Sequence, residues 1–244
     1  MPTKILHSLI SSFYADDTMS AASDSLCKNS KVSVADHLQP LLSKLEEFCS
    51  KWRIGINSEK TWALNFFKDS KNDNTPRLWL KNELIKYKTE FKFLGITFDE
   101  KLSFKSHIEN IVSRCKKRLN LLKTIRGKDW SASPETILYT YKSFVRPVIE
   151  YGSILFANAE DKLLKKIQAL ETDAIKIAFR LPPWTTNFWC YQYVKFENIL
   201  DRLKKQAKIF LKTNSDDELI KPLIESSKMS INGLHSAVYK TLNW

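Results

Sequence analysis

Glycine is scarce in this chain, with 5 among 244 residues. Phosphate-binding loops use several closely spaced glycines, so the sequence excludes a Gly-rich nucleotide loop. No apolar run approaches the length of a membrane-spanning helix, and the first four residues are not followed by the apolar core of a signal peptide. We therefore expect no membrane partner and no secretory leader.

Closely spaced metal-binding or redox pairs are also lacking. The four histidines are dispersed, and no two cysteines have the spacing of a zinc site or a redox motif. Cys49 and Cys115 fall on apolar helical faces, where we expect buried free thiols. Widely separated cysteines favour a reducing, intracellular setting. The cysteines are Cys27, Cys49, Cys115 and Cys190.

Charge is distributed unevenly over a chain whose net charge is +12. Residues 1–100 carry 14 Lys/Arg against 13 Asp/Glu, whereas residues 101–244 carry 25 against 14. A strongly basic half predicts a polyanionic partner such as nucleic acid. The alternative is an ordinary lysine-rich surface with no such partner.

Hydrophobic periodicity predicts strands and one helix before residue 100. Apolar residues recur at three and four over 36–52, which predicts an amphipathic helix. Alternation predicts strands over 61–67 and 91–98, and a small hairpin whose strands flank Lys81-Asn82. These elements cannot cover both faces of a sheet, so we expect a further polypeptide segment to complete this part.

From Ser103 onward the pattern becomes helical. Ser106 and Glu109 have the spacing of a capping box, and Ser133-Pro134 is typical of a helix start. Further helices are expected from 161 to the prolines at 182–183 and over 196–210, with a weaker pattern after 213. Three tryptophans are expected in the core and not as base-stacking platforms: Trp130, Trp184 and Trp189.

The most informative segment is Phe13-Tyr14-Ala15-Asp16-Asp17-Thr18. Aspartate is favoured in turns and disfavoured within strands, so the segment predicts a β-hairpin whose tip presents Asp16 and Asp17. Two adjacent carboxylates repel unless a cation lies between them, and hard oxygen ligands suit Mg²⁺. The alternative is an acidic surface turn.

Four separated blocks then follow in a recognisable order: Tyr14–Asp17, Trp52–Thr61, Phe91–Asp99 and Tyr141–Gly152. Together they resemble the second half of the reverse transcriptase of non-LTR (LINE-type) retrotransposons, most similar to the jockey-like group. The resemblance runs from about residue 6 to about residue 212. It rests on all four blocks, because Tyr-Ala-Asp-Asp alone is a short match.

The resemblance implies an α+β fold. Residues 1–100 would form a partial palm, residues 101–212 a helical basic thumb, and residues 213–244 a C-terminal extension. The implied function is part of an RNA-directed DNA polymerase that uses two Mg²⁺ ions for nucleotidyl transfer. The implied partners are an RNA template and a DNA primer, and the implied location is the nucleus. The oligomeric state is not implied.

The resemblance also assigns residues. Asp16 and Asp17 would bind metal, Lys60 would lie near the triphosphate, and Tyr14 would lie beside the primer terminus or pack on the sheet. Lys60 has the alternative of a solvated turn lysine, and Asn57 is read as a turn former. Phe93, Leu94 and Gly95 correspond to the primer-grip hairpin, or to an amphipathic strand with one glycine bulge.

The thumb would bind the primer–template duplex through backbone phosphates, which needs no sequence-specific contact. The alternative is a solvated helix face. Arg146-Pro147 is read as a helix exit, and Glu150-Tyr151-Gly152 as a packed turn. The basic residues assigned to the thumb are Arg114, Lys116, Lys117, Arg118, Lys123, Arg126 and Lys128.

One departure from the family limits these expectations. The palm needs a further aspartate and fingers before the hairpin, and only thirteen residues precede Tyr14. We therefore expect an incomplete polymerase that is inactive alone. Two alternatives are a non-catalytic nucleic-acid-binding protein built on the basic half, and a pseudogene product without function.

Overall fold

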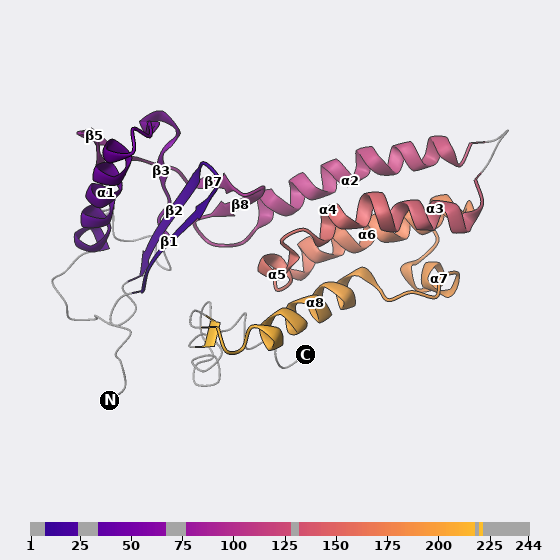
Figure 1. Ribbon diagram of the computed structural model, residues 1–244. Coiled ribbons are helices and arrows are strands. Elements are labelled where there is room, and N and C mark those ends of the chain that lie inside the picture. Colours follow the sequence, from indigo (N-terminus) through magenta and orange to yellow (C-terminus); the bar gives the residue numbers. More distant parts are fainter. Residues whose placement is uncertain (1–7, 24–33, 67–76, 128–131, 218–219, 222–244) are drawn as a thin grey trace. The chain divides into compact units, whose positions relative to one another are not determined.

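The computed structural model describes residues 8–23, 34–66, 77–127, 132–217 and 220–221 (Figure 1). The chain divides into two compact units. The first comprises residues 1–91 and 99–101, and the second comprises residues 92–98 and 102–244. Strands lie in the first part of the chain and long helices in the second. The predicted mixture of strands and helices is confirmed.

The first unit begins with the predicted hairpin. Strand β1 (Ser8–Tyr14) pairs antiparallel with β2 (Asp17–Ser23), and Tyr14 lies opposite Asp17. Helix α1 (Val34–Lys51) packs against β2, in agreement with the helix predicted over 36–52. Its residues Leu38 and Leu42 contact a small buried cluster. That cluster consists of Leu78, Leu80 and Ile85.

A second small hairpin is also confirmed. Strands β4 (Trp79–Leu80) and β5 (Glu83–Leu84) pair antiparallel, and the turn residues Lys81 and Asn82 both have positive φ. Positive φ at both central residues is the requirement of a type I′ turn, whose twist matches that of the strands. Gln39 of α1 anchors the hairpin, because its amide exchanges two hydrogen bonds of 2.8 and 2.9 Å with the backbone of Trp79.

The strand predicted over 61–67 is shorter in the structure. A 3₁₀ turn, η1 (Ser58–Lys60), precedes β3 (Trp62–Ala63), which pairs parallel with β6 (Lys86–Tyr87). Residues 64–66 are alternating but pair with no strand among the described residues, and a strand exists only where a ladder of hydrogen bonds forms. Residue 67 lies outside the described residues.

The prediction of one continuous strand over 91–98 was wrong. The segment forms two paired strands, β7 (Glu90–Phe93) and β8 (Ile96–Asp99). The chain reverses at Leu94 and Gly95, which have φ values of 46° and 83°. Glycine adopts a positive φ without steric cost, and this permits the reversal.

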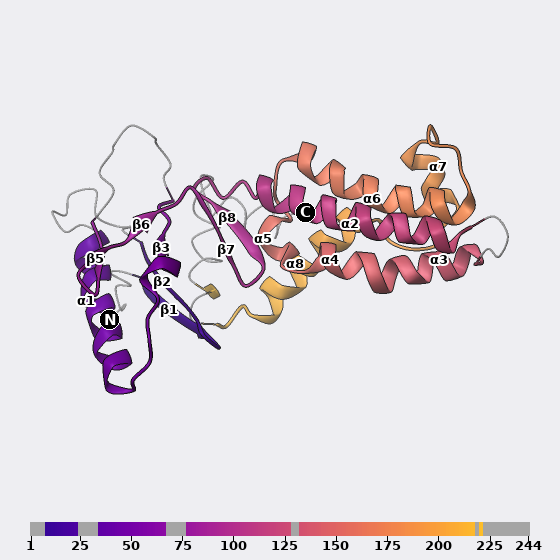
Figure 2. The same cartoon turned by 90° about the horizontal axis from the view of Figure 1, so that it is seen from above.

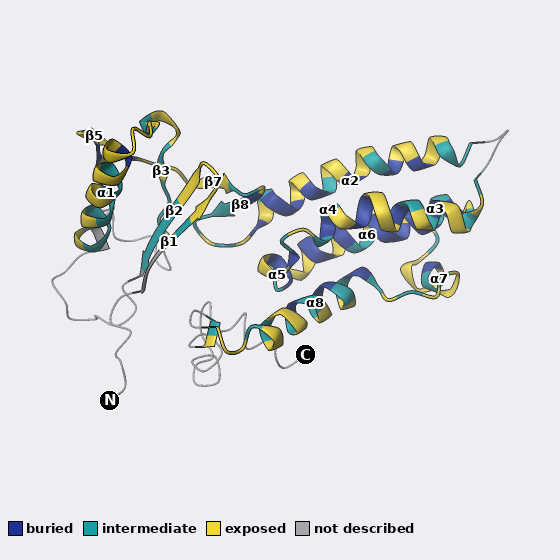
Figure 3. Ribbon diagram, in the orientation of Figure 1, coloured by how far each residue is buried: buried dark blue, intermediate teal, exposed yellow. Residues whose placement is uncertain are grey.

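The second unit is a bundle of helices around one core (Figures 1 and 2). The longest helices, α2 (Lys105–Ile125) and α6 (Asp161–Phe179), lie side by side, and α8 (Ile199–Thr213) packs on α5 and α6. Buried residues recur on the inner face of each helix (Figure 3). The remaining helices are α3 (Pro134–Thr140), the π-helix η2 (Tyr141–Val145), α4 (Arg146–Glu150), α5 (Ser153–Phe156) and α7 (Asn187–Gln192).

Several local predictions in this unit are confirmed. Ser133 caps α3 by accepting the amide N–H of Thr136 at 3.2 Å, and α6 ends at Phe179, before the two prolines. Gly152 has a φ of 66°, and a Cβ there would lie 2.5 Å from Ile96 Cδ1, so the Tyr151-Gly152 turn is packed. Cys49 and Cys115 are buried free thiols, and burial raises the pKa of Cys115 to about 11.

Two predictions at helix ends were wrong. Helix α2 begins at Lys105 after Phe104, so Ser106 lies within the first turn and cannot cap it. Glu109 instead forms an ion pair with Lys166 at 3.0 Å. Arg146-Pro147 is not a helix exit, because the helical segment continues from η2 into α4 without a break and Pro147 lies within it.

The tryptophans after α6 were also predicted wrongly. Trp184 and Trp189 are 82% and 59% exposed, and neither belongs to the core. Trp130 and Lys128 lie outside the described residues. Among the described helices, none is long and apolar enough to cross a membrane.

Candidate functional site

The acidic tip of the first hairpin is exposed. Ala15 and Asp16 form the turn, with Ala15 at a φ of 52°, and Asp16 and Asp17 are both exposed. Asp17 lies directly opposite Tyr14 in the register, so these side chains extend from the same face of the hairpin. Tyr14 is itself 63% exposed. The tip therefore presents two carboxylates and one phenol to solvent.

The tip carries two of the side chains from which a metal site could be built. Two carboxylates supply hard oxygen ligands that suit Mg²⁺, which takes six in near-octahedral geometry. Within the described ranges, no group of three or more His, Cys, Asp or Glu residues is placed to hold a metal ion. Asp16 and Asp17 could thus supply some of the oxygen ligands of one Mg²⁺ ion. The other ligands would have to come from other groups.

Lys60 lies in a different element of the same unit. It is exposed at the end of η1, whose start is capped by Asn57: the Lys60 amide N–H donates to Asn57 Oδ1 at 3.2 Å. The interpretation of Asn57 as a turn former is confirmed. The structure places Lys60 and the two aspartates on separate exposed elements, and the role of Lys60 stays a prediction.

The tip of the β7–β8 hairpin carries Phe93, Leu94 and Gly95. Phe93 and Leu94 are half-buried, and Gly95 is exposed. The tip belongs to the second unit and is fixed there, because the Tyr151 hydroxyl donates to the Leu94 carbonyl oxygen at 2.5 Å. The Tyr151 ring also closes the space beside Gly95, where a Cβ would lie 3.3 Å from Cε1. Tyr151 therefore holds the backbone at the tip of this hairpin in place.

His107 of α2 lies beneath the same hairpin. It is buried, its Nδ1 accepts the amide N–H of Thr97 at 3.3 Å, and its ring meets Phe156 edge-on at 5.4 Å. Its Nε2 is a buried polar atom with no partner. Burial lowers the pKa of His107, and the positive charges of Arg114 and Lys92 lower it further. We therefore treat His107 as neutral at pH 7.

The cations of α2 divide into two groups. Two of the predicted ligands already have intramolecular partners: Arg118 donates to the carbonyl of Phe144, and Arg126 Nε donates to the carbonyl of Ala178 at 3.0 Å. The exposed cations lie on the faces that point away from the core. These are Lys105, Arg114, Lys116, Lys117 and Lys123.

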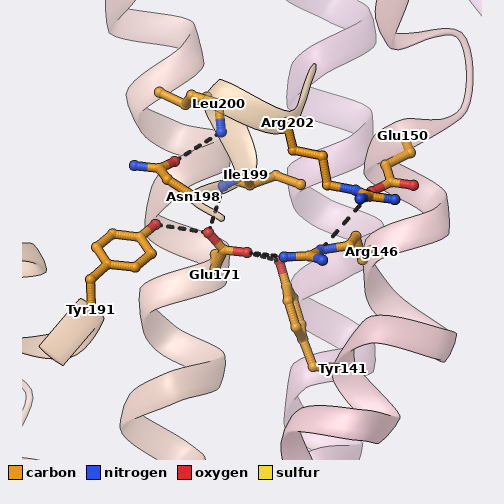
Figure 4. Close-up of polar contacts among 9 residues, drawn as sticks. All are labelled: Tyr141, Arg146, Glu150, Glu171, Tyr191, Asn198, Ile199, Leu200 and Arg202. Carbon is orange, nitrogen blue, oxygen red and sulfur yellow. Dashed lines mark hydrogen bonds and ion pairs between the residues drawn. The ribbon is translucent and has the colours of Figure 1, made fainter. Parts of the chain in front are cut away.

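A buried polar network was missed by the sequence analysis (Figure 4). Glu171 of α6 is fully buried, and its carboxylate accepts four hydrogen bonds. Arg146 donates at 2.7 Å, Tyr191 at 2.8 Å and Tyr141 at 3.3 Å, and the backbone N–H of Ile199 donates at 2.7 Å. One carboxylate therefore joins four segments of the bundle. Burial and the neighbouring Glu171 charge raise the pKa values of Tyr141 and Tyr191, which keeps both hydroxyls protonated as donors.

A signal for this network was present in the sequence. At 100° per residue, Glu171 falls on the same arc as Ile167, Leu170 and Ala174, so a single acid interrupts an apolar face. Arg146 likewise interrupts an apolar run. A charge on a buried face requires a partner, and pairing these two residues would have predicted the contact.

Comparison with known proteins shows that the chain is similar to RNA-directed DNA polymerases of mobile elements. It is 26% identical over 199 residues to the "RNA-directed DNA polymerase from mobile element jockey" of Drosophila melanogaster. It is 22% identical over 200 residues to the "Probable RNA-directed DNA polymerase from transposon X-element" of the same species, and 25% identical to the jockey polymerase of Drosophila funebris. These matches cover about 80% of this chain, which confirms the resemblance seen in the sequence blocks.

The matches cover a limited part of each relative. The chain spans about a fifth of the length of the curated relatives it matches, namely 21% or 22%. No protein-family model matches the chain, and no solved structure matches it.

Proposed function

We propose that this chain is a portion of a non-LTR retrotransposon reverse transcriptase that contributes one metal-binding hairpin and one duplex-binding helix. The observation that carries the proposal is the similarity over four fifths of the chain. It is supported by an exposed Asp16-Asp17 tip and by a helix whose exposed cations are not matched by acids. In this proposal residues 1–100 are part of a palm, and α2 begins a thumb.

The hairpin has a defined part in the proposed polymerase. Asp16 and Asp17 would bind Mg²⁺, which in nucleotidyl transfer stabilises negative charge on the reacting phosphate oxygens. Tyr14 extends from the same hairpin face as Asp17 and would lie beside a primer end. Lys60 would approach the triphosphate. Completion of the metal site requires carboxylates beyond the two on this tip.

The duplex-binding part is assigned to α2. Residues 101–130 hold nine Lys/Arg against two acids, and five of these cations are exposed on the described helix. Phosphate contacts by Lys and Arg give sequence-independent affinity, which suits a polymerase that must move along its template. Lys116 and Lys117 are adjacent exposed cations of this helix. Arg118 and Arg126 also hold the bundle together.

A primer-extension assay tests the first part of the proposal. The 244-residue chain is incubated with an RNA template, an annealed DNA primer, nucleotides and Mg²⁺. We expect no synthesis by the chain alone, because two carboxylates do not complete a two-metal site. Template-dependent synthesis that is abolished in Asp16→Ala would contradict the proposed inactivity and would place the whole metal site within this chain.

A binding assay tests the second part and addresses a non-catalytic nucleic-acid-binding role. Fluorescence anisotropy measures the affinity for an RNA–DNA duplex in the wild type, in Lys116→Ala/Lys117→Ala, and in Lys162→Ala/Lys165→Ala, a matched control on α6. We expect weaker binding only in the α2 variant, and unchanged binding in Asp16→Asn. An equal loss of duplex affinity in both lysine variants would mean that binding depends on general surface charge and not on α2.

A further inference from the structure

Four large aromatic side chains lie exposed around one short helix. Trp184 precedes α7, Phe188 and Trp189 lie within it, and Tyr193 follows it. Their exposed fractions are 82%, 67%, 59% and 51%. We call these four residues the aromatic face; α7 is largely coloured as exposed in Figure 3. Exposed apolar patches of this kind mark interaction sites on folded proteins.

The aromatic face has a rigid base. Cys190 is fully buried, and the hydroxyl of the next residue, Tyr191, donates to the buried carboxylate of Glu171 at 2.8 Å (Figure 4). Cys190 is buried and Tyr191 is half-buried, whereas Phe188 and Trp189 are exposed. The helix is thus anchored through Cys190 and Tyr191 and leaves the rings of Phe188 and Trp189 accessible to a ligand.

Ring contacts order the face further. Phe188 and Trp189 meet edge-on, with centroids 5.6 Å apart. The Tyr193 ring lies 5.2 Å from that of Phe179, at the end of α6. Rings that are held by neighbours lose little conformational entropy when a ligand binds, which favours stacking over loose hydrophobic contact.

The charge around the face is mainly positive, although the charge of the exposed Asp173 reaches Cys190 and raises the pKa of its thiol. Residues 174–196 contain Lys176, Arg180 and Lys195 and no Asp or Glu. Lys176 lies beside the face, because its Nζ donates to the carbonyl of Pro183, next to Trp184, at 2.8 Å. Arg180 is exposed and follows Phe179. The aromatic rings are therefore bordered by cations.

Planar rings interleaved with cations match one ligand chemistry. The bases of a single strand have free faces that stack on aromatic side chains, while its phosphates are attracted to Lys and Arg. In a duplex those base faces are already stacked, so the rings would gain little. We infer that the aromatic face binds single-stranded nucleic acid through unpaired bases. This site differs from the α2 surface, and it shares with the proposed function only the class of partner.

The test compares four labelled ligands of equal length by fluorescence anisotropy: oligo-U, oligo-dT, an abasic strand and a duplex. The abasic strand keeps the phosphates and removes the bases. We expect the two base-containing strands to bind at least about tenfold more tightly than the abasic strand. The ratio of oligo-U to oligo-dT affinity then shows whether RNA or DNA is preferred.

The variants locate the effect. Trp184→Ala and Trp189→Ala are each expected to weaken oligo-U binding by about tenfold, and Trp184→Phe to keep most of it. Tyr139→Ala is the matched control, because Tyr139 is a 75% exposed aromatic outside the face. All of these side chains are exposed, so the variants keep the core intact, which far-UV circular dichroism checks.

Two outcomes would overturn the inference. One is equal affinity for abasic and base-containing strands, which leaves only charge. The other is unchanged oligo-U binding in the tryptophan variants, and a simultaneous loss of self-association would then identify the face as a protein interface. Duplex binding is read separately: its absence, with tryptophan-dependent oligo-U binding intact, contradicts the proposed α2 function and leaves this inference standing.

Discussion

The Tyr151 hydroxyl donates a hydrogen bond to the carbonyl oxygen of Leu94, and the Tyr151 ring lies against Gly95. Residues that are 57 positions apart in the chain thereby fix a hairpin tip whose two turn residues both have positive φ. The backbone at this tip depends on a glycine and on one aromatic neighbour. That dependence is directly testable.

Gly95→Ala should destabilise the protein by about 1–2 kcal/mol, because an L-residue is strained at a φ of 83°. The added methyl would also meet the Tyr151 ring at 3.3 Å. Urea denaturation measures the free energy of unfolding. Gly55→Ala is the matched control, since a Cβ there meets nothing within 4 Å. A loss in the control as large as that at Gly95 would refute the argument from backbone conformation.

Glu171→Gln should destabilise the bundle by about 3 kcal/mol, because it removes the nearer of the two carboxylates that face the buried Arg146, at 2.7 Å, and leaves only Glu150, at 4.0 Å. Thermal or urea unfolding checks the change. Glu109→Gln removes the partner of an exposed lysine and should cost at most about 1 kcal/mol. Similar small effects at both positions would mean that the Arg146–Glu171 pair contributes no more than a surface contact.

Stability should fall as the pH is lowered below the ordinary pKa of histidine. The pKa of His107 in the folded protein lies below its value of 6.5 in the unfolded chain, so the unfolded state binds more protons in that window. The contribution of neutral His107 to the free energy of unfolding is thus fully present above pH 6.5. It decreases as the pH falls from 6.5 toward the pKa that His107 has in the folded protein. Unfolding free energies at pH 8 and pH 5.5 measure the loss.

The control for this pH effect is His107→Asn, whose side-chain oxygen can accept the Thr97 amide N–H without titrating. The difference in pH dependence between wild type and variant isolates His107 from the other histidines. Identical pH profiles for the two proteins would exclude His107 as the source.

The salt dependence of duplex binding should report the cations of α2. Each phosphate contact contributes about 0.9 to the slope of log affinity against log salt concentration, so Lys116→Ala/Lys117→Ala should lower it by up to about 1.8. Affinities measured over a range of salt concentrations give the slope. Lys162→Ala/Lys165→Ala should leave it unchanged, and an unaltered slope in the α2 variant would remove these lysines from the interface.

Sequence patterns predicted helices, strands and turns correctly where the side chains of the segment itself determine its structure. The acidic hairpin, α1, α6 and the Lys81-Asn82 turn all follow from periodicity or from residues with strong turn preferences. The patterns failed where a distant partner decides the structure. Residues 64–66 alternate but pair with no strand in the part of the chain that the structure describes. The 91–98 segment reverses at Gly95, whose tip lies against Tyr151, a residue distant in the sequence.

The functional residues show the same division. The Asp16-Asp17 tip is a local feature, so it could be read directly from four consecutive residues. The exposure of Trp184 and Trp189 could not be predicted from the sequence, because a large apolar side chain is expected to be buried. Whether it is buried depends on which neighbouring residues take the inward positions. Here Cys190 and Tyr191 occupy the inward positions of α7, and the tryptophans remain on the surface.

The π-helical turn at Tyr141–Val145 has a consequence for how this chain tolerates length changes. The Arg146 N–H donates to the Tyr141 carbonyl, five residues back, so both side chains point to the same carboxylate on α6. Deletion of one residue here would restore ordinary α-helical winding and rotate one of the two away. Loss of a single residue in this turn should therefore disturb the buried network around Glu171 more than a substitution of an exposed residue of the turn, such as Lys142.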